Sequence, residues 1–216
     1  MATDFWPLFD LTIRTPRLEL RPPRDPDIFA LALLASRGIH DPKEMPFRLP
    51  WTDVPSPQFE RNTLQFHWRT RANWTTEQWH LPFAVSVDGE IVGQQDMVAT
   101  DFVHTKTFET GSWLGQAHQG QGIGKEMRVA ILHFGFFGLG ARRAETGAYE
   151  NNAPSLGVTY ALGYEDNGDA VAAPRGEPHV ERKFKMSRAQ FETIRRDDIV
   201  IENLDPCLPL FGLAGD

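Results

Sequence analysis

A glycine-rich turn in front of the clearest helix constrains this chain more than any other feature. The turn is Gln119-Gly120-Gln121-Gly122-Ile123-Gly124; it follows a predicted strand, and apolar residues then recur at spacings of three and four as far as Phe137. Such spacing predicts an amphipathic helix. Because the first amides of a helix lack intrahelical partners and the helix dipole is positive there, the turn predicts a site for an anion such as phosphate.

Two well-known phosphate-binding turns do not fit this segment. The dinucleotide pattern G-x-G-x-x-G starting at Gly120 needs a glycine where the chain has Lys125, and it belongs near the first strand of a βαβ unit. The P-loop pattern needs a glycine in place of Gln119 and a serine or threonine in place of Glu126. The sequence therefore excludes a Rossmann dinucleotide site and a P-loop nucleotide-triphosphatase site.

The charge balance also limits the partners. Lysine and arginine total 22 against 29 acidic residues, which gives a net charge of -7. This argues against a general binder of nucleic acid or of anionic membranes, because both attract basic surfaces. An anionic ligand must then be held locally, by backbone amides with help from Lys125 and Arg128.

Length and composition predict one folded domain over residues 1–216, with 41% hydrophobic and 24% charged residues. The single cysteine, Cys207, excludes an intramolecular disulfide framework and indicates a reducing compartment, so we expect a cytoplasmic protein.

No apolar run reaches the roughly 18 to 20 residues of a membrane helix, and the N-terminus lacks a signal-peptide pattern. The histidines and the cysteine lack metal-site spacing, so we expect no metal.

The rest of the pattern alternates strands and helices. Leu18 and Leu20 alternate with charged neighbours, as in a half-exposed strand, and Asp88-Gly89 between two apolar runs predicts a hairpin. Gly111 suggests a bulge or a close backbone approach. The predicted elements are a strand over 12–21, helices over 28–36 and 59–73, strands over 83–87, 91–99 and 105–115, the helix from 123, a strand over 141–149, a helix over 154–162 and a strand over 180–187. This order predicts a mixed α/β sheet.

Several segments resemble one enzyme family. The pattern Q-x-x-G-x-G from Gln119 to Gly124 resembles the acyl-coenzyme A signature of the GCN5-related N-acetyltransferase (GNAT) superfamily, and TPRLELRP, FETGSWLG and NNAPSLGVTYALGY resemble segments of its RimJ/RimL branch. The match covers about Thr12 to Ser187. The whole chain also resembles an actinobacterial subgroup associated with acetyl- or succinyl-coenzyme A. The resemblance implies a mixed, mainly antiparallel sheet flanked by helices, in which the fourth and fifth strands splay apart.

The resemblance further implies where the donor binds. In the family, the pantetheine arm of coenzyme A (CoA) lies between the splayed strands, and Asn152 and Ser155 approach it from the other side. The residues implied at the arm are Trp113, Leu114 and Gly115, and those at the pyrophosphate are Gln119, Gly120, Gln121, Gly122, Ile123, Gly124 and Lys125. Two alternatives stay open, because the glycine turn can be a plain helix start and Asn152 and Ser155 can be ordinary helix caps.

Acyl transfer from a thioester to an amine needs a neutral amine and a proton for the departing thiolate. Deprotonating a lysine-like amine at pH 7 costs roughly 4 to 5 kcal/mol, so a general base or a water relay is useful. Glu145 is the first candidate base and Glu109 the second, each with the alternative of a plain surface or ion-paired carboxylate. Glu177 is a third, placed by resemblance to RimL-like proteins. Ser155 is the candidate proton donor to sulfur.

The acceptor pocket is expected in the aromatic region between the first two helices and the following strand. Trp51, His40, Asp41 and His80 are the candidate wall residues, with core or dimer packing as the alternative. The leading hypothesis is an acyl-CoA-dependent N-acyltransferase that uses acetyl- or succinyl-CoA and acts on a primary amine of a small molecule or a protein. The competing hypothesis is a catalytically silent CoA-binding sensor or interaction protein. A homodimer stays open.

Overall fold

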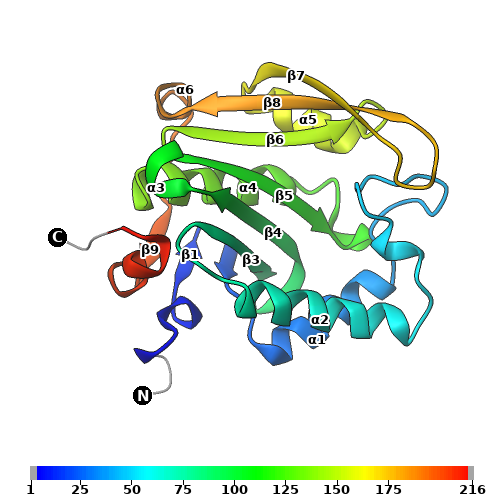
Figure 1. Cartoon of the computed structure of the whole chain (residues 1–216), viewed down its shortest axis with the longest axis horizontal. Helices are drawn as coiled ribbons and strands as arrows, with labels where there is room; N and C mark the ends of the chain where they lie inside the picture. Colours follow the sequence, from blue (N-terminus) through cyan, green and yellow to red (C-terminus); the bar gives the residue numbers. More distant parts are fainter. Residues whose placement is uncertain (1–3, 214–216) are drawn as a thin grey trace.

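The computed structural model describes residues 4–213, and its centre is one nine-stranded sheet in the order β7-β8-β6-β5-β4-β3-β2-β1-β9 (Figure 1). The strands are β1 (Thr12–Arg14), β2 (Leu18–Arg21), β3 (Gln78–Val87), β4 (Glu90–Thr100), β5 (Thr107–Leu114), β6 (Arg143–Tyr149), β7 (Glu165–Ala172), β8 (His179–Ser187) and β9 (Val200–Glu202). Neighbours pair antiparallel except β5 and β6, which are parallel. The predicted mixed, mainly antiparallel α/β fold is confirmed.

Helices cover both faces of this sheet. They are α1 (Asp25–Ser36), α2 (Gln58–Ala72), α3 (Phe102–Thr105), α4 (Ile123–His133), α5 (Ala153–Ala161) and α6 (Arg188–Glu192), with a π-turn η5 (Phe134–Gly138) continuing α4 and short 3-10 turns η2 (Pro7–Phe9), η3 (Trp51–Asp53), η4 (Gln116–His118) and η6 (Asp205–Phe211). Helices α1 and α2 pack together and against β4 and β3, whereas α4 crosses behind β4 and β5 (Figure 1). Within residues 4–213, no helix has the length and apolarity to cross a membrane.

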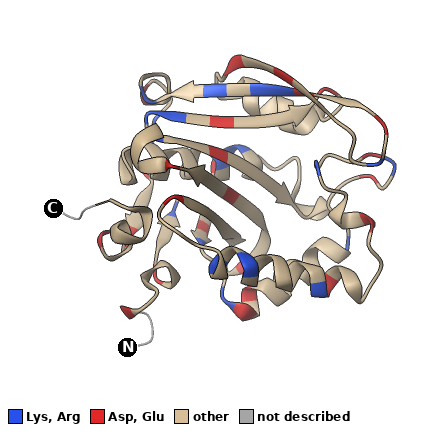
Figure 2. Ribbon diagram, in the orientation of Figure 1, with Lys and Arg blue, Asp and Glu red and all other residues tan. Residues whose placement is uncertain are grey.

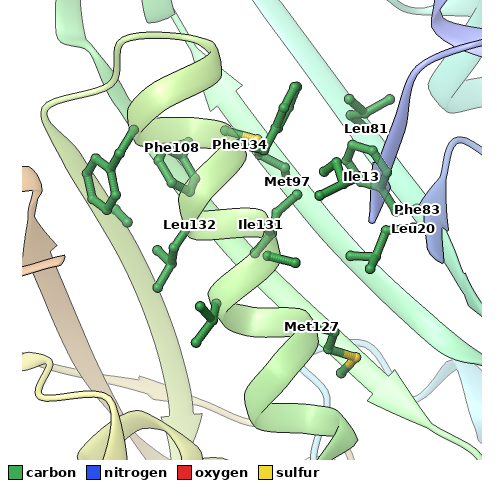
Figure 3. Packing of buried hydrophobic residues seen from close by; sticks show 14 of the residues in the cluster. Ile13, Leu20, Leu81, Phe83, Met97, Phe108, Met127, Ile131, Leu132 and Phe134 are labelled. Atoms are coloured by element: carbon green, nitrogen blue, oxygen red, sulfur yellow. The ribbon is translucent and has the colours of Figure 1, made fainter. Parts of the chain in front are cut away.

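The core is the contact between α4 and the sheet, as the sequence periodicity predicts. Ile131 and Phe134 are fully buried and meet Phe83 and Met97 from the central strands (Figure 3). The rings of Phe83 and Phe134 lie 5.7 Å apart in an edge-to-face arrangement. This packing fixes the axis of α4, and with it the position of the glycine turn beside β5.

The N-terminal strand predicted over 12–21 is instead two strands joined by a tight turn. β1 and β2 pair antiparallel with Ile13 opposite Leu20. The Thr15 amide donates to the Leu18 carbonyl at 2.9 Å, and the Leu18 amide donates back to Thr15 Oγ1 at 2.9 Å. Pro16 lies inside the turn, where no hydrogen bond between the strands requires the N–H that proline lacks. The alternation of apolar residues changes phase across the turn, from Ile13 to Leu18 and Leu20, and the prediction of one continuous strand overlooked this change.

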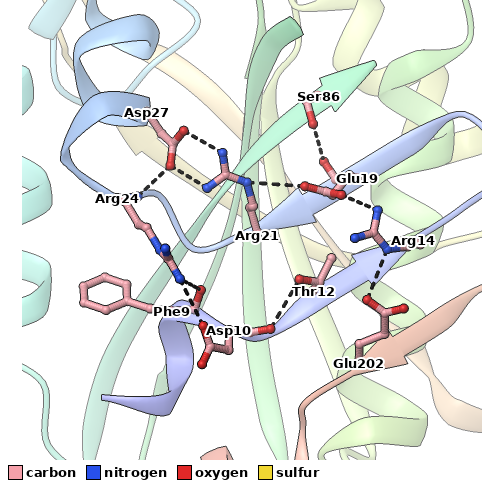
Figure 4. A network of polar contacts seen from close by, with 10 residues as sticks. All are labelled: Phe9, Asp10, Thr12, Arg14, Glu19, Arg21, Arg24, Asp27, Ser86 and Glu202. Carbon is pink, nitrogen blue, oxygen red and sulfur yellow. Dashed lines mark hydrogen bonds and ion pairs between the residues drawn. The ribbon is translucent and has the colours of Figure 1, made fainter. Parts of the chain in front are cut away.

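A polar network ties this hairpin to α1 (Figure 4). The Arg21 guanidinium makes two hydrogen bonds to the Asp27 carboxylate, at 2.6 and 2.7 Å, and the same carboxylate accepts from the Arg24 amide at 2.8 Å. The Asp27 carboxylate thus accepts from the N-cap amide of α1, as in a capping box, and α1 begins at Asp25, ahead of the predicted start at residue 28.

Other differences concern strands and one glycine. β7 and β9 were not predicted, because β7 is mostly exposed and polar and β9 has three residues. The bulge suggested at Gly111 is wrong, since the β4–β5 register is continuous with Asp96 opposite Gly111. A Cβ at Gly111 would meet no protein atom within 4 Å, so the position faces open space.

Close packing between α4 and β5 should make Gly135→Ala destabilising. A Cβ at Gly135 would lie 2.4 Å from ring atoms of Phe108, which is closer than carbon atoms pack. We expect a loss of about 1–3 kcal/mol in the free energy of unfolding measured with urea. The control is Gly157→Ala in α5, where a Cβ meets nothing within 4 Å. Equal stability of the two variants would contradict the packing described for α4.

Candidate functional site

The sheet opens into a cleft where β5 and β6 stop pairing. Their parallel contacts run from Thr107 opposite Arg143 to Thr110 opposite Thr146, while β5 continues to Leu114 paired with β4 alone. A cleft of about 920 Å³ lies there, and its lining includes Gly111, Trp113 and Leu114. The splayed fourth and fifth strands expected from the sequence are these two. The unpaired edge of β5 can accept an extended ligand as an additional strand.

The glycine turn brings free helix amides to this cleft. The N-cap of α4 is Gly122 in the left-handed region at φ 79°, without a side-chain cap, and Gly120 has φ 72°. Gln119 braces the turn, since its Nε2 donates to the Leu114 carbonyl at 2.9 Å and to the Ile39 carbonyl at 2.8 Å. Gly124 lines the cleft. The amides that open α4 therefore have no side-chain cap, and Gly124 brings the first turn of the helix to the cleft.

A buried carboxylate anchors the first turn of α4 to the N-terminal hairpin. Glu126 accepts hydrogen bonds from Thr15 Oγ1 at 2.5 Å and from Arg17 Nε at 2.7 Å. Burial acts to raise the pKa of Glu126, but these two partners outweigh it and lower the pKa below its ordinary value. The charged carboxylate thus holds the turn in place at neutral pH.

Arg128 does not assist the turn as expected. It is 4% exposed, lines the cleft and donates to Thr146 Oγ1 on β6 at 3.1 Å and to Ser112 Oγ on β5 at 3.4 Å. The reason is helical geometry: Arg128 lies more than one turn into α4, on the face that packs against the sheet. Its Nε has no partner among the described residues. Its guanidinium spans the space between the splayed strands.

The start of α5 forms the opposite wall of the cleft. Asn152 is the N-cap, and its Oδ1 accepts from the Ser155 amide at 3.2 Å, so the capping role holds. Both residues also line the cleft. Ser155 Oγ makes no hydrogen bond within the part of the chain that the structure describes, which leaves it available to a ligand.

The candidate bases are placed differently from one another. Glu145 lies outside the cleft lining and pairs with Arg143 at 2.6 Å, whereas Glu109 is exposed and lines the cleft. Glu177 lies in the exposed β7–β8 connection, outside the lining. Figure 2 shows acidic positions on the neighbouring strands β4, β5 and β6. Of the three candidates, the cleft contains Glu109.

Sequence reasoning missed a further carboxylate, Glu181. It is buried in the cleft lining on β8 and pairs with Arg48 Nε at 2.8 Å and Lys183 Nζ at 3.0 Å. A second ion pair, between Asp53 and Arg175 at 2.6 Å, joins the same two segments of the chain. The segment between α1 and α2 is therefore fastened to the β7–β8 hairpin across the cleft.

An aromatic wall faces the gap on the α1–α2 side. Trp51 stacks on Phe59 with ring centroids 5.6 Å apart and lies 6.1 Å from Trp113. His40 and Asp41 line the cleft beside it, with His40 Nε2 2.8 Å from Thr52 Oγ1. His80, the fourth candidate acceptor residue, lies outside this lining.

The comparisons with known proteins agree on the family. Residues 17–165 match the model of the acetyltransferase (GNAT) domain. The SPbeta prophage-derived uncharacterized N-acetyltransferase YokL of Bacillus subtilis (strain 168) is 29% identical over an alignment of 144 residues that covers 61% of this chain and 80% of that protein. The chain belongs to the GNAT acetyltransferase family. It is therefore a GNAT-type transferase, an acyl-CoA-dependent N-acyltransferase in general terms.

Solved structures of GNAT proteins show the same fold. Mycobacterium smegmatis RimJ in complex with CoA-disulfide superposes with a TM-score of 0.67 at 21% identity, covering 88% of this chain and 95% of that one. RimL, a ribosomal L7/L12 alpha-N-protein acetyltransferase in complex with coenzyme A, gives 0.61 at 16% identity, covering 80% and 95%. The RimJ/RimL branch indicated by the sequence is thus among the structural neighbours.

A buried histidine from α2 belongs to the lining of the cleft. His67 on α2 is 1% exposed and lines the cleft. Burial lowers its pKa to about 4, against a smaller opposing effect of the Asp96 carboxylate. The imidazole is therefore neutral at pH 7. Neither His67 nor any other histidine of residues 4–213 belongs to a group of three or more side chains that could hold a metal ion.

His67 should make folding stability fall as the pH drops. The unfolded chain takes up a proton at His67 near pH 6.5, whereas the folded chain resists it until about pH 4. Between pH 6.5 and 5 the loss at this residue should be about 2 kcal/mol. Urea unfolding of His67→Gln should lack that part of the pH dependence, and the exposed His104→Gln should keep it. Identical pH profiles for wild type and His67→Gln would contradict the buried neutral state.

Proposed function

We propose that this chain, acting as one domain over residues 1–216, transfers an acyl group from acetyl-CoA or succinyl-CoA to a primary amine. The amine, carried by a small molecule or a protein, attacks the thioester directly in a ternary complex. The observation that carries the proposal is the coincidence of two features: an open β5 edge, and uncapped α4 amides beside it. A reducing cytoplasmic setting fits the free, buried Cys207.

The residues present fit a CoA thioester. The pyrophosphate needs several N–H donors at a point of positive potential, which the amides from Gly120 to Gly124 supply. The pantetheine arm needs an unpaired strand edge, which β5 supplies from Gly111 to Leu114. Lys125 is exposed next to the turn and can add a positive charge.

The transfer chemistry is assigned to residues that line the cleft. Ser155 Oγ is the proposed proton donor to the departing sulfur, because it lines the cleft and is not engaged elsewhere in the described chain. Of the candidate bases singled out by sequence, Glu109 is the one that lines the cleft. The proposal gives Glu145 no direct role, since Arg143 holds its carboxylate outside the lining.

Arg128 distinguishes the two donors. Two arginines that could bind a succinyl carboxylate have acidic partners: Arg48 pairs with Glu181 and Arg71 with Asp25. Arg128 is bonded to hydroxyls and keeps a free Nε within the described chain. A succinyl-CoA enzyme would use this guanidinium for the distal carboxylate. If the donor is succinyl-CoA, the ratio of kcat/KM for succinyl-CoA to kcat/KM for acetyl-CoA should fall in Arg128→Gln. If the donor is acetyl-CoA, both the wild type and Arg128→Gln should prefer acetyl-CoA.

Binding of CoA should depend on the lack of a side chain at Gly124. A Cβ there would make ordinary contacts with Leu114 at 3.7 Å and Val158 at 3.8 Å, so Gly124→Ala should fold normally while placing a methyl group in the cleft. We expect the Kd for CoA in calorimetry to rise about tenfold, which corresponds to about 1.4 kcal/mol. Gly157→Ala serves again as the control. An unchanged Kd would remove the glycine turn from the donor site.

Turnover separates an enzyme from a silent sensor. Acetyl-CoA and succinyl-CoA are each incubated with a mixed panel of amines, and release of free thiol is followed. The enzyme should release thiol in proportion to amine consumed, and Ser155→Ala should lower kcat about tenfold with little change in the Kd for CoA. Saturable CoA binding that raises the melting temperature without any turnover would support the sensor instead.

A further inference from the structure

A group of polar side chains lies near the point where β5 and β6 stop pairing, on the side of the sheet that packs against α2. It consists of His67 on α2, His80 on β3, and Gln94 and Asp96 on β4, of which the sequence singles out His80 alone. The Asp96 side chain is 17% exposed and lines the cleft. The carboxylate is therefore within reach of a ligand.

Two neighbouring side chains hold this carboxylate in place. His80 Nε2 lies 3.0 Å from Asp96 Oδ1, and Gln94 Nε2 donates to Oδ1 at 3.0 Å and to Oδ2 at 3.1 Å. In the described part of the chain, Asp96 has no ion pair with lysine or arginine, in contrast to Glu181 and Glu145. The carboxylate is thus oriented without a lysine or arginine partner, which suits recognition of a cationic ligand.

The position of Asp96 relative to the gap points to the reacting atoms. Its strand partner is Gly111, the residue of β5 that follows Thr110, the last one paired with β6. Because Gly111 has no side chain and no protein atom lies within 4 Å of its Cβ position, the space next to Asp96 is open. In the proposed ternary complex, this is where an acceptor can meet the thioester lying along β5.

A buried nitrogen without a partner supports a ligand at this point. His67 lines the cleft at 1% exposure, and its Nδ1 has no hydrogen-bond partner among the described residues. Buried polar atoms are normally paired, so an unpaired one beside a cleft indicates a bound group. Two further charged side chains of the cleft lining come from α2 and from β5, the neighbour of β4: they are Arg69 and Glu109.

We propose that Asp96 is a catalytic residue that receives a cationic primary amine, with His80 and Gln94 as its positioning residues. This rests on the proposed N-acyltransferase function. The bound ammonium first gives one proton to the Asp96 carboxylate, which passes it to water and is ionised again. The neutral amine nitrogen then forms the C–N bond to the thioester carbonyl carbon, becomes positively charged and passes a second proton to Asp96. The C–S bond then breaks, the thiolate takes a proton from solvent through Ser155, and Asp96 returns its proton to water. The acceptor is thus recognised by its charged nitrogen.

Asp96→Asn tests the assignment with acetyl-CoA as donor and phenethylamine, spermidine and an unblocked tetrapeptide as acceptor probes. We expect kcat/KM for the amine to fall at least 100-fold, with the Kd for CoA within twofold of wild type. Asp101→Asn is the matched control, because it removes another Asp–His pair, Asp101 with His104 at 2.8 Å, on the exposed surface. Asp96→Asn activity within threefold of wild type would overturn the proposal.

A binding measurement needs no turnover and separates charge recognition from general damage. Calorimetry in the presence of CoA compares phenethylamine with phenethyl alcohol. Wild type should bind the amine at least tenfold more tightly, and Asp96→Asn should bind both alike; an unchanged preference for the amine in Asp96→Asn contradicts the proposal. Asp96→Glu should restore part of that preference, which a misfolded protein would not.

His80→Ala should weaken amine turnover more than His80→Gln, which keeps an N–H donor. Loss of CoA binding in wild type would instead refute the proposed function itself.

Discussion

The end of β5–β6 pairing after Thr110 and Thr146 is the constraint on which the site depends. Beyond that point each strand keeps a single neighbour: β4 holds β5 as far as Leu114, and β8 holds β6 as far as Tyr149. The gap is therefore stable without its own hydrogen bonds, because each wall belongs to an intact antiparallel pair. Packing of α4 beneath the strands keeps the two walls in one body.

The same arrangement explains how an acidic chain can hold an anionic donor. Its net charge is -7, so long-range attraction would not bring in a polyphosphate. The positive potential is instead local, at the uncapped amides after Gly122 and at the buried Arg128. The carboxylates Asp96, Glu109 and Glu181 also line the cleft, and Glu181 is paired with Arg48 and Lys183. The cleft thus presents groups of both signs, which suits the proposed pairing of an anionic donor with a cationic acceptor.

Features set by local sequence were predictable, and those set by packing were not. The glycine turn, the periodic helix after it and the Asp88-Gly89 hairpin depend on residues that are close in the sequence, and all three are present. The orientation of the Arg128 side chain depends instead on which face of α4 meets the sheet. Asp96 gave no signal, because an acidic residue in a half-exposed strand is ordinary until its register against Gly111 is known.

The two ion pairs that fasten the α1–α2 segment to the β7–β8 hairpin act through side chains. Arg48 and Arg175 keep 53% and 32% of their side chains exposed, so water and salt compete for these contacts. The Glu181 carboxylate is only 8% exposed, so the Arg48–Glu181 pair is the less screened of the two. Because neither pair belongs to the backbone pairing of the sheet, separating them would widen the cleft without breaking any strand pair.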